Sequence, residues 1–244
     1  MKIEYGGVKK NLMFVISWSF LKAFEKCPLQ QKLIRIDKVV PKKIDERRFI
    51  AGSVGHRFFE VWAKRGFDDE ITPKTVERIL YIMSKRKYIV WRNKSDYERV
   101  KAKVIQEADM IIEAVHHHGI DKLNIQVERL FSTPLPCKQH SVAGKMDIVV
   151  NHGAWVLEMK MSADLKWADP DQLIFYGLLI GAIKRRYPAR LAFFLPVIPN
   201  FEDRLLDIEF SKNDFLNMYE RIQGLIEAWN KGDFPEASNL ETCE

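Results

Sequence analysis

Apolar residues in the first half of the chain recur at the spacing of α-helices. The clearest pattern covers residues 96–118 and should end at Gly119, because glycine readily takes the left-handed conformation found at helix C-termini. The apolar positions of this stretch fall on one helix face: Val100, Val104, Ala108, Ile111, Ile112 and Val115. Further helices are predicted from Ser17 or Ser19 with an interruption near Pro28, over about 50–65, and from Pro73 to about 86.

The second half of the chain reads mainly as strands. A helix over about 170–187, capped by Asp169, is apolar around most of its circumference and should pack on a sheet. A last helix should run from Ser211 to about Lys231, because "SKND" has the form of a capping box. The predicted strands cover residues 123–132, 145–150, 154–160, 190–197 and 204–211.

This order of elements predicts a single α/β domain over residues 1–244. A mainly helical lobe should occupy about 1–120, and an α/β core with a mixed sheet should occupy about 121–244. The chain has 244 residues, of which 47% are hydrophobic, as in ordinary globular proteins. No apolar run is long enough to span a membrane and no secretory signal is recognisable, so a cytoplasmic protein without membrane partners is expected. Three widely spaced cysteines argue against a disulfide framework and fit a reducing compartment.

Charged side chains interrupt the most strand-like hairpin of the sequence, "GKMDIVVNHGAWVLEMK" at residues 144–160. Glu158 and Lys160 are two apart and therefore share a face of their strand. If His152 and Gly153 form a two-residue loop, Asp147 lies opposite Glu158 with Cβ atoms about 5 Å apart. Two carboxylates at that separation repel each other unless a positive charge lies between them.

A divalent cation would relieve this repulsion. Carboxylate oxygens on a rigid scaffold suit Mg²⁺ or Mn²⁺, and the backbone carbonyl of Met159 could add a third oxygen. Lys160 beside the ion could orient or deprotonate a water molecule, or stabilise charge on a phosphorane. The alternative is a surface hairpin in which Lys160 pairs with Glu158 and Asp147 is solvated.

The segments "GKMD" and "EMK" resemble the split signature of the PD-(D/E)XK nuclease superfamily. Three further segments narrow the resemblance to its RecB-like branch, which includes exonucleases of CRISPR adaptation and phage recombination nucleases. "DQLIFYG" is similar to the branch's Gln-x-x-x-Tyr motif, and this implies DNA contacts for Gln172 and Tyr176. "GSVGHRFFE" resembles its Gly-x-x-His helix, and this implies that His56 is a further metal ligand. The resemblance implies a restriction-endonuclease-like core, in which helices flank a central mixed sheet, plus an N-terminal helical lobe.

Other residues are less firmly tied to this resemblance. Glu60, one helical turn after His56, could orient the imidazole. The resemblance implies that Glu128 corresponds to an acidic residue that some members carry on the first core strand, although a salt bridge at the strand edge explains it equally well. "SWSFLKAFEKCPLQQKL" looks like the start of iron–sulfur members of the branch, whose first cluster ligand would be Cys27. Cys137 matches no family ligand and the sequence ends just after Cys243, so this is either a cluster-free member or a chain that lacks a C-terminal tail. No iron–sulfur cluster is expected in this chain.

The net charge of +6 and pI of about 9.1 are modest, but basic residues are concentrated in one segment. Residues 84–103 carry eight Lys or Arg against two acids, with aromatic residues between them. Basic groups neutralise phosphates and aromatic faces stack on bases, which favours nucleic-acid binding. The candidates are Lys85, Arg86, Lys87, Trp91 and Arg92. The alternative is a solvated helix face whose aromatic residues point to the core.

Together these features predict a metal-dependent DNA nuclease. The family resemblance favours an exonuclease acting on DNA ends in recombination, repair, phage DNA processing or CRISPR adaptation. It would work at the nucleoid, or in the host cytoplasm if the gene is a phage gene, either as a homo-oligomer or with a partner protein. A structure-specific endonuclease and a non-cleaving DNA-binding subunit are the alternatives. The sequence has no Gly-x-x-x-x-Gly-Lys phosphate loop, which excludes a built-in ATP-driven motor.

Overall fold

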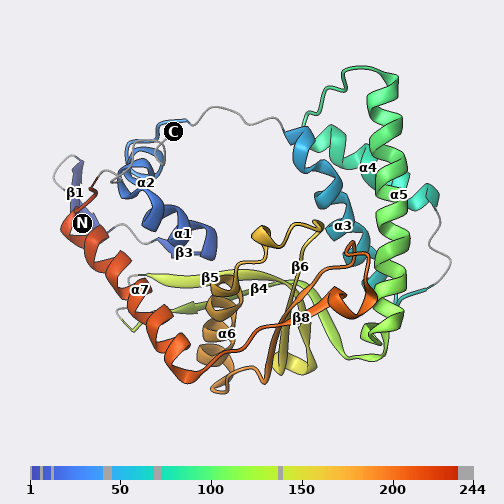
Figure 1. Cartoon of the computed structure of the whole chain (residues 1–244). Helices are drawn as coiled ribbons and strands as arrows, with labels where there is room; N and C mark the ends of the chain where they lie inside the picture. The colour runs from blue at the N-terminus through green and yellow to red at the C-terminus, as the bar shows by residue number, and fades with distance from the viewer. Residues whose placement is uncertain are drawn as a thin grey trace.

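A mixed β-sheet forms the centre of the molecule (Figure 1). The computed structural model describes residues 2–5, 8–11, 14–40, 46–68, 73–136 and 140–235. Within these residues the central sheet has six strands: β3 (Val15–Ile16), β4 (Ile125–Pro134), β5 (Ser141–Val150), β6 (Trp155–Met159), β7 (Arg190–Phe194) and β8 (Leu205–Asp207). A separate antiparallel pair consists of β1 (Lys2–Tyr5) and β2 (Val8–Asn11).

The long strand β5 organises the sheet. It pairs antiparallel with β4 along its whole length, while β3 and β6 pair with its two ends. Parallel pairing of β6 with β7 requires a crossover, and the helix α6 (Pro170–Lys184) provides it. The strand β8 pairs antiparallel with β7 and completes the central sheet.

The β5–β6 hairpin has the predicted register. Ile148 faces Leu157 and Val150 faces Trp155, so the register continues to Asp147 opposite Glu158. The connection is longer than predicted, because pairing stops at Val150 and the turn η3 (Asn151–Gly153) follows. It still contains an even number of residues and has the same centre, which leaves the register unchanged.

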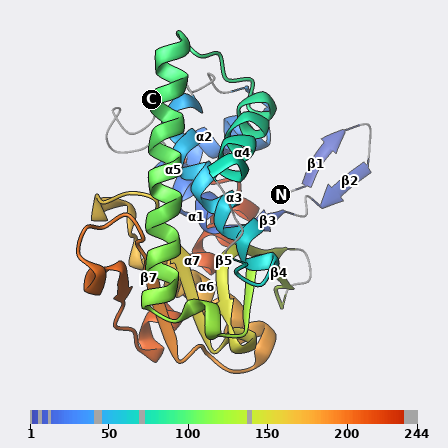
Figure 2. The same cartoon turned by 90° about the vertical axis from the view of Figure 1, so that its right-hand side faces the viewer.

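Helices cover both faces of the sheet, as expected for the predicted fold class. One hydrophobic cluster joins the sheet to α6, to α7 (Lys212–Lys231) and to α1 (Trp18–Lys26). The other cluster joins it to α3 (Ile50–Lys64), α4 (Pro73–Arg86) and α5 (Lys94–His117). Figures 1 and 2 show these two groups of helices on opposite sides of the molecule. The helices of the first 120 residues are therefore divided between the two faces of the sheet. The organisation of the chain as a single domain stays a prediction.

Alternation of buried side chains is interrupted in the middle of β5. Val142 and Met146 pack in the cluster of α6 and α7, whereas Ile148 and Val150 pack in the cluster of α3. All four positions would share one face of a regular strand. The strand therefore changes the layer that it supports between Met146 and Ile148, at Asp147.

Several element boundaries differ from those predicted. The break at Pro28 separates α1 from a second helix, α2 (Pro28–Arg35), and β8 is shorter than the predicted strand 204–211. The short strands β1, β2 and β3 were not predicted. The remaining elements are 3₁₀ turns: η1 (Glu46–Phe49), η2 (Ile120–Lys122), η4 (Leu165–Trp167) and η5 (Phe201–Arg204).

The cysteines differ from expectation in one respect. Cys27, buried between α1 and α2, is disulfide-bonded, so the inference from cysteine number and spacing is wrong for this residue. Cys137 and Cys243 lie outside the described residues, and the absence of an iron–sulfur cluster stays a prediction. Among the described helices, none combines the length and apolar character needed to cross a membrane.

Candidate metal centre

Two carboxylates face each other across β4 and β5. The pairs Val127–Ile148 and Arg129–Met146 place Glu128 opposite Asp147, at the point where β5 changes layers. Glu128 has a φ of +52°, which is costly for a residue with a side chain, yet the register on either side of it is unchanged. The two carboxylates therefore meet where regular strand geometry is interrupted.

Helix α3 brings His56 to these carboxylates. The neighbouring Gly55 lies against Met161, the residue that follows Lys160, and a Cβ at position 55 would come within 2.6 Å of the Met161 Cε atom. The glycine thus allows the helix to pack closely on the end of β6.

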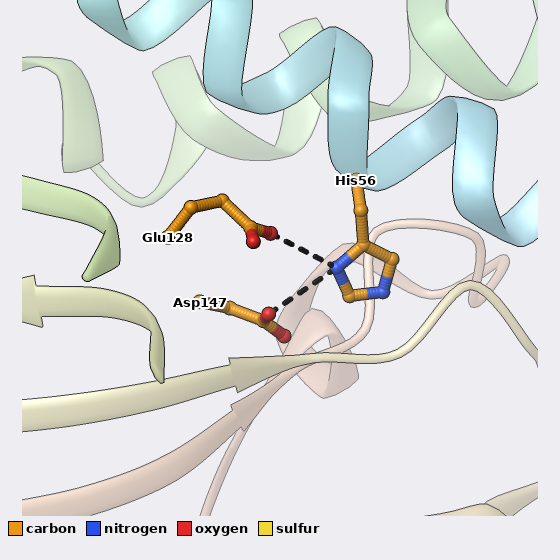
Figure 3. A group of neighbouring side chains, drawn as sticks. All are labelled: His56, Glu128 and Asp147. Carbon is orange, nitrogen blue, oxygen red and sulfur yellow. Dashed lines mark ion pairs between the residues drawn. The ribbon is translucent and has the colours of Figure 1, made fainter. Parts of the chain in front are cut away.

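His56, Glu128 and Asp147 form a compact group of potential ligands (Figure 3). The His56 Nδ1 atom lies 3.4 Å from Asp147 Oδ1 and 3.8 Å from Glu128 Oε1. One ligand atom from each residue can be chosen so that all three lie within 4.8 Å of one another. A set of two carboxylate oxygens and one imidazole nitrogen fits a divalent cation such as Mg²⁺ or Mn²⁺.

Charges of the protein itself compensate the two carboxylates. Burial alone would lower the pKa of His56, but the charge and hydrogen bond of Asp147, with a hydrogen bond to Glu128, raise it to about 10. Burial alone would raise the pKa of Glu128, but hydrogen bonds from His56 and Lys145 lower it to about 2. An imidazolium and an ammonium therefore occupy the neighbourhood in which a metal ion would bind.

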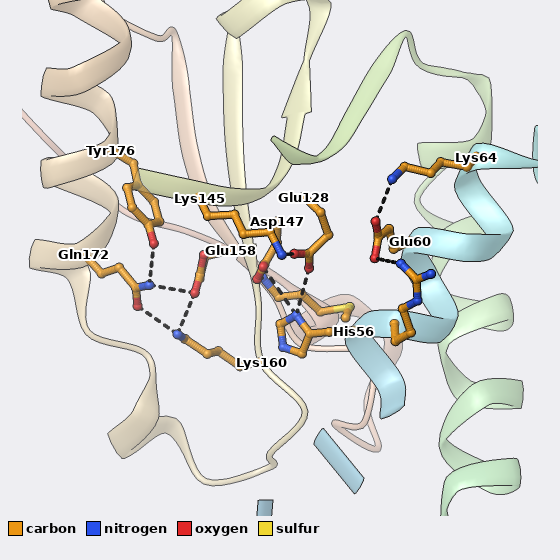
Figure 4. A network of polar contacts seen from close by, with 12 residues as sticks. His56, Glu60, Lys64, Glu128, Lys145, Asp147, Glu158, Lys160, Gln172 and Tyr176 are labelled. Atoms are coloured by element: carbon orange, nitrogen blue, oxygen red, sulfur yellow. Dashed lines mark hydrogen bonds and ion pairs between the residues drawn. The ribbon is translucent and has the colours of Figure 1, made fainter. Parts of the chain in front are cut away.

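A second polar cluster is centred on Lys160 (Figure 4). The Lys160 Nζ atom donates to Glu158 Oε1 at 2.9 Å and to Gln172 Oε1 at 2.8 Å. The Gln172 Nε2 atom donates to the same Glu158 oxygen at 2.7 Å and to the Tyr176 hydroxyl at 3.1 Å. The four-residue spacing of Gln172 and Tyr176 puts both on the same face of α6. Gln172 accepts from the Lys160 ammonium group directly, and Tyr176 contacts Gln172.

Tyr176 is packed tightly under this cluster. It is only 7% exposed, and its ring lies so close to Gly144 of β5 that a Cβ there would come within 2.8 Å of the Tyr176 Cε1 atom. Burial and the charge of Glu158 raise the pKa of the tyrosine, which therefore stays neutral. The predicted contacts of Gln172 and Tyr176 with DNA stay predictions.

Glu158 has an oxygen that the described protein atoms leave free. Its side chain is 8% exposed, and its Oε2 atom is buried without a hydrogen-bond partner among the described residues. Burial and the charge of Asp147 raise the pKa of Glu158 to about 8, even though Lys160 acts in the opposite direction. A buried acceptor without a partner is what a metal ligand needs in the metal-free state, so Glu158 also fits a cation site.

Asp147 links the two clusters. Its Oδ2 atom accepts a hydrogen bond of 2.9 Å from the backbone N–H of Met159, and its Oδ1 atom faces His56. The two carboxylates predicted to be close, Asp147 and Glu158, are therefore part of one continuous network. Glu128, already a candidate from the sequence, lies 3.8 Å from His56, and coordination by Glu158 and the Met159 carbonyl stays a prediction.

Some predicted site residues lie elsewhere. Glu60 accepts hydrogen bonds from Arg57 and Lys64, whereas the imidazole of His56 faces Glu128 and Asp147, so the predicted contact of Glu60 with His56 is wrong. Lys145, in contrast, was missed. It is two residues before Asp147 in "GKMD" and forms an ion pair with Glu128.

The basic segment forms no part of the network drawn in Figure 4. Lys85 and Arg86 end α4, and Lys87 pairs with Glu46 at 2.7 Å. Trp91 stacks edge-on against Tyr97, and both pack on the core cluster of α3, as the alternative interpretation expected for the aromatic residues. Arg92 is exposed to solvent.

Comparison with known families agrees with this arrangement. A family model described as the PD-(D/E)XK nuclease superfamily matches residues 15–244. The match includes every strand of the central sheet and both polar clusters. No curated protein is similar enough to count as a match.

Proposed function

The chain belongs to the PD-(D/E)XK nuclease superfamily, and we propose that it is a deoxyribonuclease that hydrolyses phosphodiester bonds at DNA ends with the aid of Mg²⁺ or Mn²⁺. One observation carries the proposal. Lys160 is held by Glu158 and Gln172 directly beside a group of two carboxylates and a histidine that fits a divalent cation.

Asp147, Glu128 and His56 would hold the ion, and the free oxygen of Glu158 would extend the ligand set. A divalent cation bound there would activate water and neutralise charge on the scissile phosphate. The N–H of Met159 fixes the orientation of the Asp147 carboxylate. These residues would therefore supply the ligands once the ion displaces the protons of His56 and Glu158.

Lys160 would act on the reacting groups themselves. Its ammonium group, fixed by two hydrogen bonds, is suited to orient the attacking water and to stabilise negative charge on the phosphate. The water oxygen bonds to phosphorus and the bond from phosphorus to the 3′-oxygen breaks. The 3′-oxygen takes up a proton, which leaves a 5′-phosphate on the other product.

The preference for DNA ends follows from the resemblance of "DQLIFYG" and "GSVGH" to motifs of RecB-like exonucleases. A role in recombination, repair, phage DNA processing or CRISPR adaptation fits such an activity. It would place the protein in the cytoplasm, at the nucleoid or in the host of a phage. We further propose that the protein acts as a homo-oligomer or together with a partner protein of the same pathway.

The test is a cleavage assay on end-labelled linear DNA and on circular DNA, each single- and double-stranded. The wild type is compared with Lys160→Ala and with Lys166→Ala, an exposed lysine of the following loop, each in Mg²⁺, Mn²⁺ and EDTA. We expect metal-dependent loss of linear DNA with the wild type and with Lys166→Ala, and none with Lys160→Ala.

Other results would contradict the proposal in defined ways. Cleavage of circles as readily as linear DNA would indicate an endonuclease. DNA binding without cleavage of any substrate would indicate a non-cleaving DNA-binding subunit. Full activity of Lys160→Ala would exclude the assigned role of that lysine.

A further inference from the structure

Helices α3 and α4 line a pocket of about 640 Å³. Its volume lies within the roughly 300–1,000 Å³ that is typical of ligand sites in proteins. The basic side chains that line it are Arg57, Arg65, Lys74, Arg78, Arg86 and Lys87, and among the described residues no acidic side chain belongs to the lining.

Among the described residues, acids pair with only two of these six basic side chains. Arg57 pairs with Glu60 and Lys87 with Glu46. Within the part of the chain that the structure describes, the other four basic side chains form no ion pair with an acid. Like charges one helical turn apart, such as those at 74 and 78, destabilise a helix. An arrangement of this kind is therefore suited to binding an anion with several charges.

The pocket also has an apolar part, formed by Val61, Ile79, Ile82 and Met83. Inorganic phosphate or a sulfate group would gain nothing from these side chains. A nucleotide strand offers both kinds of contact, because its phosphates match the basic groups and its sugars and bases match the apolar surface. The composition of the pocket therefore favours a chain of nucleotides.

The pocket is adjacent to the metal centre through helix α3. Arg57 directly follows His56, and successive residues of an α-helix are about 100° apart around its axis. Arg57, Val61 and Arg65 continue along the pocket side of the helix at intervals of four residues. A strand bound at the metal centre could thus continue around α3 into the pocket.

We propose that this pocket binds the part of the substrate DNA strand that lies beyond the scissile phosphate. The proposal rests on the proposed nuclease function and extends it by a second binding site on the same strand. It also revises the DNA contacts predicted for residues 84–103, of which Arg86 and Lys87 belong to the pocket.

The test measures DNA binding without cleavage, by fluorescence anisotropy of labelled oligothymidylates in EDTA. Oligomers of about 4 and about 20 nucleotides bracket the site sizes typical of single-strand binding. The pocket variant is Arg65→Glu with Arg78→Glu. The matched control is Lys184→Glu with Lys212→Glu, which changes the net charge equally at two exposed positions of α6 and α7.

We expect the pocket variant to bind the long oligomer at least about tenfold more weakly, and the short oligomer as the wild type does. Loss of two phosphate contacts should also make the slope of log K against log salt shallower by about 1.4 for single-stranded DNA. The variant Arg65→Gln with Arg78→Gln should show a smaller effect in the same direction. This milder variant serves as the test instead if circular dichroism shows that the charge reversal disturbs folding.

The proposal is overturned if the pocket variants bind the long oligomer as the wild type does, or if the control variant loses as much affinity. It is also overturned by a second pattern: thymidine monophosphate binds the wild type but not the pocket variant, while both proteins bind the long oligomer equally well. The occupant of the pocket would then be a free nucleotide. These readouts need no catalysis. A wild type that binds DNA but never cleaves it contradicts the proposed function and leaves the pocket result standing.

Discussion

Binding of Mn²⁺ at the metal centre should release protons, in a number that depends on pH. The pKa of His56 is raised to about 10, so its imidazole is protonated at neutral pH and must lose that proton before its nitrogen can bind a metal ion. The pKa of Glu158 is raised to about 8, so this carboxyl group is also protonated at neutral pH. A metal ion that recruits both residues displaces both protons.

The size of the effect follows from these two values. At pH 7, deprotonating a group whose pKa is about 10 costs about 4 kcal/mol, which weakens metal binding about 1,000-fold. Protons compete with the metal ion for His56, so the affinity for the metal rises with pH up to the pKa of His56. We expect about two protons released per ion at pH 6.5 and about one at pH 9, where Glu158 is already ionised.

Isothermal titration calorimetry in two buffers with different ionisation enthalpies counts these protons directly. The variant Glu158→Gln is the control and should release about one proton at both pH values. Release of one proton by the wild type at both values would show that Glu158 does not join the ion. Binding of Mn²⁺ at pH 6.5 without any proton release would refute the electrostatic reasoning altogether.

Three further perturbations test other parts of the structure. Gln172→Leu removes the acceptor that fixes Lys160, and single-turnover cleavage at saturating Mn²⁺ should fall about 10- to 100-fold. Gly144→Ala forces a Cβ against the tyrosine ring beneath the site and should lower the free energy of unfolding in urea by about 1–3 kcal/mol. Gly224→Ala, in the open interior of α7, should raise it by about 0.5–1 kcal/mol, and equal effects at the two glycines would contradict the packing described. The depressed pKa of Glu128 stabilises the folded state above about pH 4.5, so in EDTA the wild type should lose more stability than Glu128→Gln as the pH falls towards 2, and parallel losses would contradict the assignment.

The parts of the site that depend on local pattern could be predicted from the sequence. The alternating residues around Asn-His-Gly give the β5–β6 hairpin its register, and thereby the proximity of Asp147 to Glu158. The four-residue spacing of Gln172 and Tyr176 likewise places both on one side of a helix. Lys145 was equally accessible to this reasoning, because residues two apart on a strand share a face, but its ion pair with Glu128 was not foreseen.

The parts that depend on contacts between distant segments could not be predicted in the same way. The position of Glu128 follows from the pairing of β4 with β5 and from a left-handed backbone conformation, which no propensity of glutamate would indicate. The change of layer at Asp147 breaks the alternation on which strand prediction relies. The approach of α3 to the sheet depends on the contact of Gly55 with Met161, which are more than 100 residues apart.

Each acidic side chain of the metal centre is matched by a basic group of the same chain. Lys145 faces Glu128, His56 faces Asp147, and Lys160 faces Glu158. Such internal counterions make the folded state independent of the ion, in contrast to small zinc domains that unfold when their metal is removed. Under the proposed function, the protein would fold and bind DNA before it takes up the ion. The divalent cation would then be required for catalysis alone and not for the fold.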